Sequence, residues 1–203
     1  MAIRDNLKGG SSKKLYDALQ YSGLVTEDMT YNEMCEILKE YFPEAFKLYM
    51  SSANEGAFDI FQKYNSNGTL TFGNEMTLSQ TTGLGSKTKI YSKEVDLTNY
   101  KKLHFEHVSS AARGNTYSWI VLTIDKAKKE TAPTATLPKD LDTSNSVVIY
   151  KLLDQEQNSN SGEVNIDVSG LSGKHYVSVE ISSNVADALI QTKISNMYMT
   201  GMS

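Results

Sequence analysis

Glu163–Ser182, with the sequence Glu-Val-Asn-Ile-Asp-Val-Ser-Gly-Leu-Ser-Gly-Lys-His-Tyr-Val-Ser-Val-Glu-Ile-Ser, is the stretch that decides the fold of this chain. Apolar residues occupy alternate positions in both of its halves: Val164, Ile166 and Val168 in the first, and Val177, Val179 and Ile181 in the second. Successive side chains of a strand point to opposite faces, so this period of two predicts two half-buried strands of antiparallel type.

The same period recurs over the C-terminal two thirds of the chain. After the turn-forming residues 65–68, the apolar residues all occupy even-numbered positions: Leu70, Phe72, Met76 and Leu78. Further strand-like runs lie near residues 88–97, 101–108, 116–125, 146–153 and 189–200. About eight antiparallel strands are typical of a β-sandwich, here of jelly-roll type. No helical pattern separates the runs, which argues against a parallel sheet.

The N-terminal part of the chain has helical periodicity instead. Leu15, Tyr16 and Leu19 predict a first helix near residues 12–22 that ends at Gly23, and Thr30 with Glu33 forms a capping box that opens a second helix. Pro43 ends that helix or opens a third, in which Phe46, Leu48, Tyr49 and Met50 follow. We therefore expect an N-terminal helical attachment segment over residues 1–57, a linker over 58–68 and a β-sandwich domain over 69–203.

Composition excludes several classes of function. The formal net charge of −4 and the absence of a Lys/Arg cluster argue against nucleic acid as a partner. The single cysteine, Cys35, cannot form an internal disulfide, and no stretch is long and apolar enough for a signal peptide or a membrane helix. We expect synthesis in a cytoplasm, no membrane insertion and no cofactor.

No arrangement of residues predicts catalysis. Cys35 has no histidine beside it, and His104 and His107, three apart on a strand, should point to opposite faces and not share a metal. Asp140 and Asp142, near Ser144 and Asn145, form a weak calcium candidate, although a solvated turn explains them better. A pair of carboxylates of the glycosidase type stays open from sequence, but the favoured interpretation is a protein that is not an enzyme.

An aromatic face offers the main candidate for ligand binding. Ile120, Leu122 and Ile124 share one face of a strand, which leaves Tyr117 and Trp119 on the other, preceded by Arg113 and Asn115. Sugars stack their C–H faces on such rings while polar side chains bind their hydroxyls. The alternative is that both rings pack beneath the helices or the crossover loop.

Two parts of the sequence resemble known families. Residues 1–8 (Met-Ala-Ile-Arg-Asp-Asn-Leu-Lys), 15–19 (Leu-Tyr-Asp-Ala-Leu) and 26–38 (Thr-Glu-Asp-Met-Thr-Tyr-Asn-Glu-Met-Cys-Glu-Ile-Leu) resemble the N-terminal segment of minor virion proteins of phages and prophages of Gram-positive bacteria. Residues 95–106 (Val-Asp-Leu-Thr-Asn-Tyr-Lys-Lys-Leu-His-Phe-Glu) and 164–179 are similar to the galactose-binding-like and jelly-roll sandwiches of phage tail and cell-wall proteins.

The resemblance implies a non-enzymatic structural protein of the virion, in a tail, baseplate or capsid fibre. Its N-terminal helices would attach to other virion proteins, and its sandwich would adsorb to a host-surface glycan. We also expect homo-oligomers, because virions reuse subunits in symmetric sets. The alternative is a soluble carbohydrate-binding or adhesion module without a virion role.

Overall fold

The structure is a computed structural model that describes residues 19–26, 29–30, 33–34, 37, 47–50, 55–63, 67–81, 85–112, 118–129, 141, 143–155, 157–183 and 188–201. The chain divides into two compact units, Met1–Lys47 and Leu48–Ser203. In the second unit, the described residues form two antiparallel sheets of six strands each, which pack as a sandwich.

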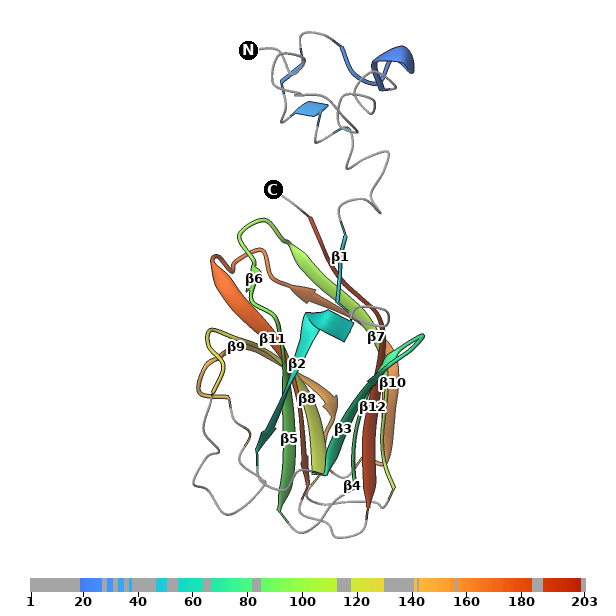
Figure 1. Cartoon of the computed structure of the whole chain (residues 1–203), viewed down its shortest axis with the longest axis vertical. Helices are drawn as coiled ribbons and strands as arrows, with labels where there is room; N and C mark the ends of the chain where they lie inside the picture. Colours follow the sequence, from blue (N-terminus) through green and yellow to red (C-terminus); the bar gives the residue numbers. More distant parts are fainter. Residues whose placement is uncertain are drawn as a thin grey trace. The chain divides into compact units, whose positions relative to one another are not determined.

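Sheet A has the strand order β10-β7-β12-β4-β3, with β1 beside β12 (Figure 1). Its strands are β1 (Leu48–Tyr49), β3 (Gly68–Phe72), β4 (Met76–Thr81), β7 (Lys102–Ala111), β10 (Ser159–Asp167) and β12 (Leu189–Thr200). Sheet B has the order β2-β5-β11-β8-β9, with β6 beside β11. Its strands are β2 (Phe58–Lys63), β5 (Ser86–Ser92), β6 (Val95–Asp96), β8 (Ser118–Asp125), β9 (Ser146–Leu153) and β11 (Lys174–Ser183), and the 3-10 turn η2 (Glu55–Ala57) precedes β2.

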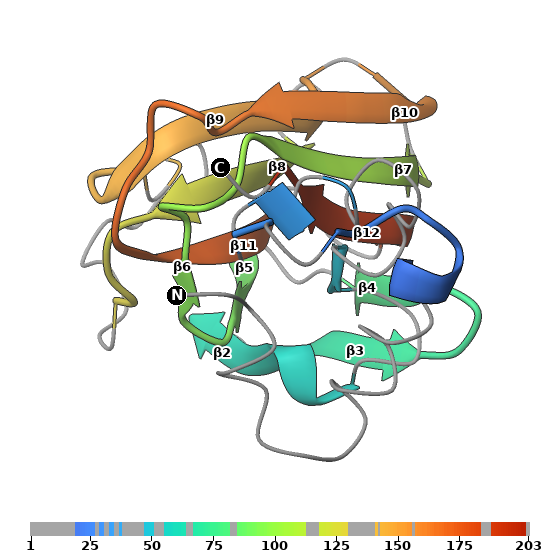
Figure 2. The ribbon, with the colours of Figure 1, turned by 90° about the horizontal axis from the view of Figure 1, so that it is seen from above.

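The chain crosses between the sheets after β1, β2, β4, β6, β7, β9, β10 and β11, as in a jelly roll (Figure 2). Alternate residues of both sheets point into the space between them. One apolar cluster contains Leu78 and Phe105 from sheet A and Ile90, Leu122 and Val179 from sheet B. The period of two in the sequence therefore predicted the core of the sandwich correctly.

The outer face of sheet B is buried as well over its central strands β5, β8 and β11, and it carries charges. Lys87 Nζ lies 3.1 Å from Glu180 Oε1, and Lys89 Nζ lies 2.8 Å from Asp125 Oδ2. Burial lowers the pKa of Lys89, but the carboxylates of Glu180 and Asp125 outweigh burial, so the pKa lies above its ordinary value. The prediction of half-buried strands thus holds for β10, whereas β11 is buried on both faces over its last seven residues.

The expected helices of the first unit are seen only in part, because its described residues are helical at 19–21, 33–34 and 37 alone. Residues 19–21 are helical, and Gly23 has a positive φ of 76°. Its amide donates to Gln20 O, and the Leu24 amide donates to Leu19 O, which is the Schellman pattern of a helix end. The Thr30 amide donates to Glu33 Oε2 at 2.7 Å, so the predicted capping box is formed.

Three expectations about the elements differ from the structure. The third helix is wrong at Leu48 and Tyr49, because these residues form β1 and pair with Met199 and Tyr198. The described strands number twelve where about eight were expected, mainly because the short strands β1 and β6 and the edge strand β2 carry little alternation. The sandwich also includes residues expected in the attachment segment and linker, since it begins at Leu48 and β2 pairs with β5.

Among the described residues, no helix has the length and apolar character to cross a membrane. Within the same residues, no group of three or more His, Cys, Asp and Glu side chains is placed to hold a metal ion.

Candidate functional site

A row of polar and aromatic side chains crosses the outer face of sheet A. Asn165 of β10 pairs with His104 of β7, His104 pairs with Tyr198 of β12, and Tyr198 pairs with Tyr49 of β1. The rings of His104 and Tyr198 are stacked with centroids 4.6 Å apart, and those of Tyr198 and Tyr49 are tilted at 5.5 Å. His104 Nδ1 lies 3.1 Å from Asn165 Oδ1. The four side chains form one continuous surface, which we call the aromatic row.

A β-bulge in β12 places Tyr198 on this face. Before the bulge, Ile190 and Ile194 point into the core; after it, Met197 and Met199 do. The change of parity turns Tyr198 outward. Asn196 lies within the bulge at a φ of 49°, a conformation that asparagine tolerates better than most residues. A strict period of two would have placed Tyr198 with the core residues, so sequence reasoning missed it.

The row ends at a pocket of about 430 Å³ at one end of the sandwich. Its lining comes from β1, η2, β6 and the segments around them: Leu48, Tyr49, Met50, Ala57, Lys93, Glu94, Val95, Asp96, Asn99 and Tyr100. Tyr49 is 44% exposed, whereas Tyr100 is partly buried, and burial raises the pKa of its phenol. Volumes of roughly 300–1,000 Å³ with mixed apolar and polar linings are usual for small-molecule sites. We call this the Tyr49 pocket.

Some polar groups of the Tyr49 pocket already have hydrogen-bond or ion-pair partners, and others do not. Glu94 accepts from Lys174 Nζ at 2.7 Å, which lowers the pKa of its carboxyl, and Tyr176 Oη donates to it at 3.2 Å. Asp96 accepts from the amide and hydroxyl of Thr98 through Oδ1, and its pKa is lowered as well. Within the described part of the chain, the side chains of Lys93 and Asn99 have no hydrogen-bond or ion-pair partner.

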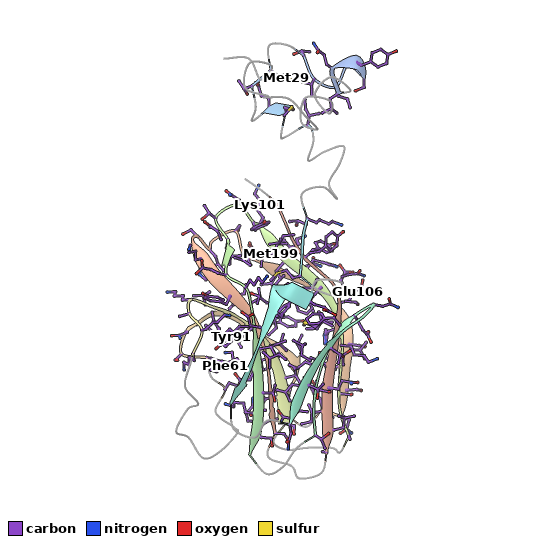
Figure 3. All side chains as sticks on the ribbon, viewed as in Figure 1. Met29, Phe61, Tyr91, Lys101, Glu106 and Met199 are labelled. Carbon is purple, nitrogen blue, oxygen red and sulfur yellow. The ribbon has the colours of Figure 1, made fainter. Side chains whose placement is uncertain are left out.

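Two carboxylates lie next to the aromatic row. Glu163 and Glu106 are direct partners in the β10–β7 ladder, and both side chains are exposed. Asn165 Nδ2 donates to Glu163 Oε1 at 3.1 Å, and Asn196 Nδ2 donates to Glu106 Oε1 at 2.9 Å. Both glutamates line a hollow of about 310 Å³. Figure 3 shows Glu106 at the side of sheet A, across the sandwich from Phe61 and Tyr91.

The residues predicted from sequence lie elsewhere. Trp119 lies on the outer face of sheet B, as its parity predicts, but it is only 4% exposed, and its Nε1 has no hydrogen-bond partner among the described residues. The structure does not bring Trp119 to the aromatic row. The other candidates fall outside the described residues: Arg113, Asn115, Tyr117, Cys35, Asp140 and Asp142.

The two strand histidines point to opposite faces, as their spacing predicts. His104 belongs to the aromatic row, and His107 is buried in the core beside Ser109. Sequence reasoning discounted His104 as a metal ligand without weighing it as part of a binding surface. Its neighbours Asn165 and Glu163 were visible only as the polar positions of an alternating strand.

Comparison with known proteins shows likeness at the level of structure alone. No family model and no curated protein matches the chain. Solved structures that it resembles include the K3 adhesin domain of Lys-gingipain from Porphyromonas gingivalis w83, with 9% identity over 76% of this chain and 99% of that one at a TM-score of 0.48. A second is the carbohydrate recognition domain of Emp47p, which is 11% identical over 77% of this chain and 96% of that one, with a TM-score of 0.45. A third is the carbohydrate-binding module CBM28, specific for non-crystalline cellulose, which is 12% identical over 76% of this chain and 94% of that one, with a TM-score of 0.43. At these values the likenesses carry no argument about function.

Proposed function

We propose that the sandwich binds a glycan, without catalysis, through the Tyr49 pocket and the adjoining aromatic row. The observation that carries this proposal is the pocket itself. It combines an exposed tyrosine ring with the unpartnered donors of Lys93 and Asn99 in a concavity of about 430 Å³. A sugar ring has apolar C–H faces and polar hydroxyls at its edge, and both kinds of group find partners there.

The aromatic row holds Tyr49 in place for this role. One face of Tyr198 is covered by His104, and Tyr49 packs against Tyr198 from the edge of the sheet. Tyr49 is therefore the ring of the row with the most surface left for a ligand. Because its neighbours already fix its position, little side-chain entropy is lost when a sugar stacks on it.

Binding measured by glycan array and then by calorimetry tests the proposal on the full chain. We expect Tyr49→Ala to weaken binding about tenfold or more through loss of ring contact, and Tyr49→Phe to retain most of it. Tyr21→Ala is the matched control, because Tyr21 is 96% exposed and belongs to the first unit. Wild-type affinity in Tyr49→Ala, or no glycan bound by the wild type, would contradict the proposal.

The first unit is proposed as the means of attachment, in a virion. The first unit is compact by itself, which supports this proposal. Leu19, Val25 and Met34 form a small apolar cluster within it. Attachment to other virion proteins would then display the sandwich, and homo-oligomers would multiply its contacts with a host surface. If the protein is instead a soluble module, glycan binding should not depend on particles at all.

A further inference from the structure

The carboxylates beside the aromatic row set the charge of this surface. Glu106 and Glu163 are cross-strand partners, whose Cα atoms lie about 4.5–5.5 Å apart in an antiparallel ladder. Like charges directly opposite each other on a sheet are destabilising. Among the described residues, no lysine or arginine forms an ion pair with either carboxylate. His104 Nδ1 lies 3.6 Å from Glu163 Oε1, and Lys193, which lines the same hollow, has its Nζ 2.8 Å from Glu75 Oε1. The pair therefore leaves a local negative charge next to the site.

The carboxylates also offer acceptors and no donors. Each has one oxygen engaged by an asparagine amide, from Asn196 or Asn165. The hollow that they line contains further polar groups from Ser161 and Ser195. A ligand that reaches this hollow gains most by presenting a cationic donor, whereas an anionic group would meet repulsion.

The distance to the Tyr49 pocket sets the size of that ligand. Adjacent strands lie about 4.8 Å apart, and alternate residues of one strand lie about 6.7 Å apart. Tyr49 and Glu106 are two strands apart and are offset by two residues along the strand direction, so about 12 Å separates them. A single sugar cannot reach from one to the other, but an oligosaccharide can. Its other end would meet the ammonium of Lys93 in the pocket, which disfavours a second cation there.

From this arrangement we infer that the site selects oligosaccharides that carry a free amine, with the ammonium between Glu106 and Glu163 and a neutral sugar on Tyr49. This inference rests on the proposed function and names its ligand class: partly deacetylated amino-sugar polymers. Polymers rich in phosphate or carboxylate are excluded from the same surface by charge.

Calorimetry with an N-acetylglucosamine oligosaccharide that has one deacetylated terminal sugar, and with the fully acetylated oligosaccharide of equal length, tests the inference at a pH where the sugar amine is protonated. We expect the amine form to bind about fivefold tighter at low salt, and the difference to shrink near 1 M salt, where the Debye length is about 3 Å. Glu106→Gln and Glu163→Gln, alone and together, should remove the preference while binding of the acetylated form persists. Asp59→Asn is the control, an exposed carboxylate of sheet B with the same change of charge.

The outcomes separate this inference from the proposed function. Equal affinity for the two oligosaccharides would overturn the inference and leave glycan binding intact, whereas failure of the wild type to bind either would overturn both. Equal loss of both ligands in Glu106→Gln would assign the carboxylate a structural role and overturn the inference. A preference that disappears on adding a calcium chelator would also overturn it, because a bridging cation would then be the true occupant of the carboxylate pair.

Discussion

His107 shows how one residue ties the stability of the sandwich to pH. Its side chain is buried in the core, with Nδ1 3.0 Å from Ser109 Oγ, and that hydroxyl lies 2.8 Å from Thr192 Oγ1. Burial disfavours the imidazolium form, so the pKa of His107 lies below its ordinary value of 6.5. The folded protein therefore holds a neutral histidine in a polar strip of an otherwise apolar interior.

The direction of the pKa shift predicts acid sensitivity. Below pH 6.5 the unfolded chain takes up a proton at His107 that the folded chain refuses, so the free energy of unfolding should fall as pH drops. One such group contributes at most about 1.4 kcal/mol per pH unit. Urea unfolding between about pH 7.5 and 5.5 measures the slope, and His107→Gln should flatten it. If the variant keeps the wild-type slope, another group causes the acid sensitivity.

Among the elements, β3 and β5 are in contact where Gly68 lies against the side chain of Thr88. A Cβ atom on Gly68 would overlap the side chain of Thr88, although the two residues belong to different sheets. Gly68→Ala should therefore push the strands apart and lower the free energy of unfolding by about 1–3 kcal/mol. Gly162→Ala is the matched control, since a Cβ there meets nothing within 4 Å. Equal unfolding midpoints for the two variants in urea would contradict this account.

Elements with clear alternation were predictable from sequence, and those that depend on distant pairing were not. The runs at 146–153 and 189–200 coincide with β9 and β12. By contrast, β1 has only two residues and exists because Tyr49 and Leu48 pair with the far end of the chain. Local periodicity contains no information about such a partner, which is why a helix was expected there.

The candidate site depended on the same kind of distant information. Trp119 was placed on the correct face of its strand, but its burial follows from what packs over sheet B, which parity does not show. Tyr198 belongs to the site only through the bulge at Asn196, and Tyr49 only through β1. Aromatic residue types indicate a candidate binding surface, but they do not say which aromatic residues meet in space.

At the scale of the whole molecule, the boundary at Lys47 separates two compact units, and truncation there tests the function proposed for each. A chain of residues 48–203 retains β1, Tyr49 and the whole apolar cluster of the sandwich, so it should fold and bind glycan as the full chain does. A chain of residues 58–203 lacks β1 and the Tyr49 side of the pocket, and it exposes the backbone of Tyr198 and Met199 in β12. It should lose glycan binding and unfold at lower urea concentration.

The same pair of truncations separates attachment from recognition. If the first unit attaches the protein to a particle, residues 48–203 should bind glycan and yet be missing from purified particles, as judged by immunoblotting. The shorter chain should lack both properties, so comparison of the two assigns glycan binding to β1 and incorporation to residues 1–47. Normal incorporation of residues 48–203 would refute attachment through the first unit. Glycan binding by residues 58–203 at full strength would refute the site, because neither Tyr49 nor Leu48 would then be required.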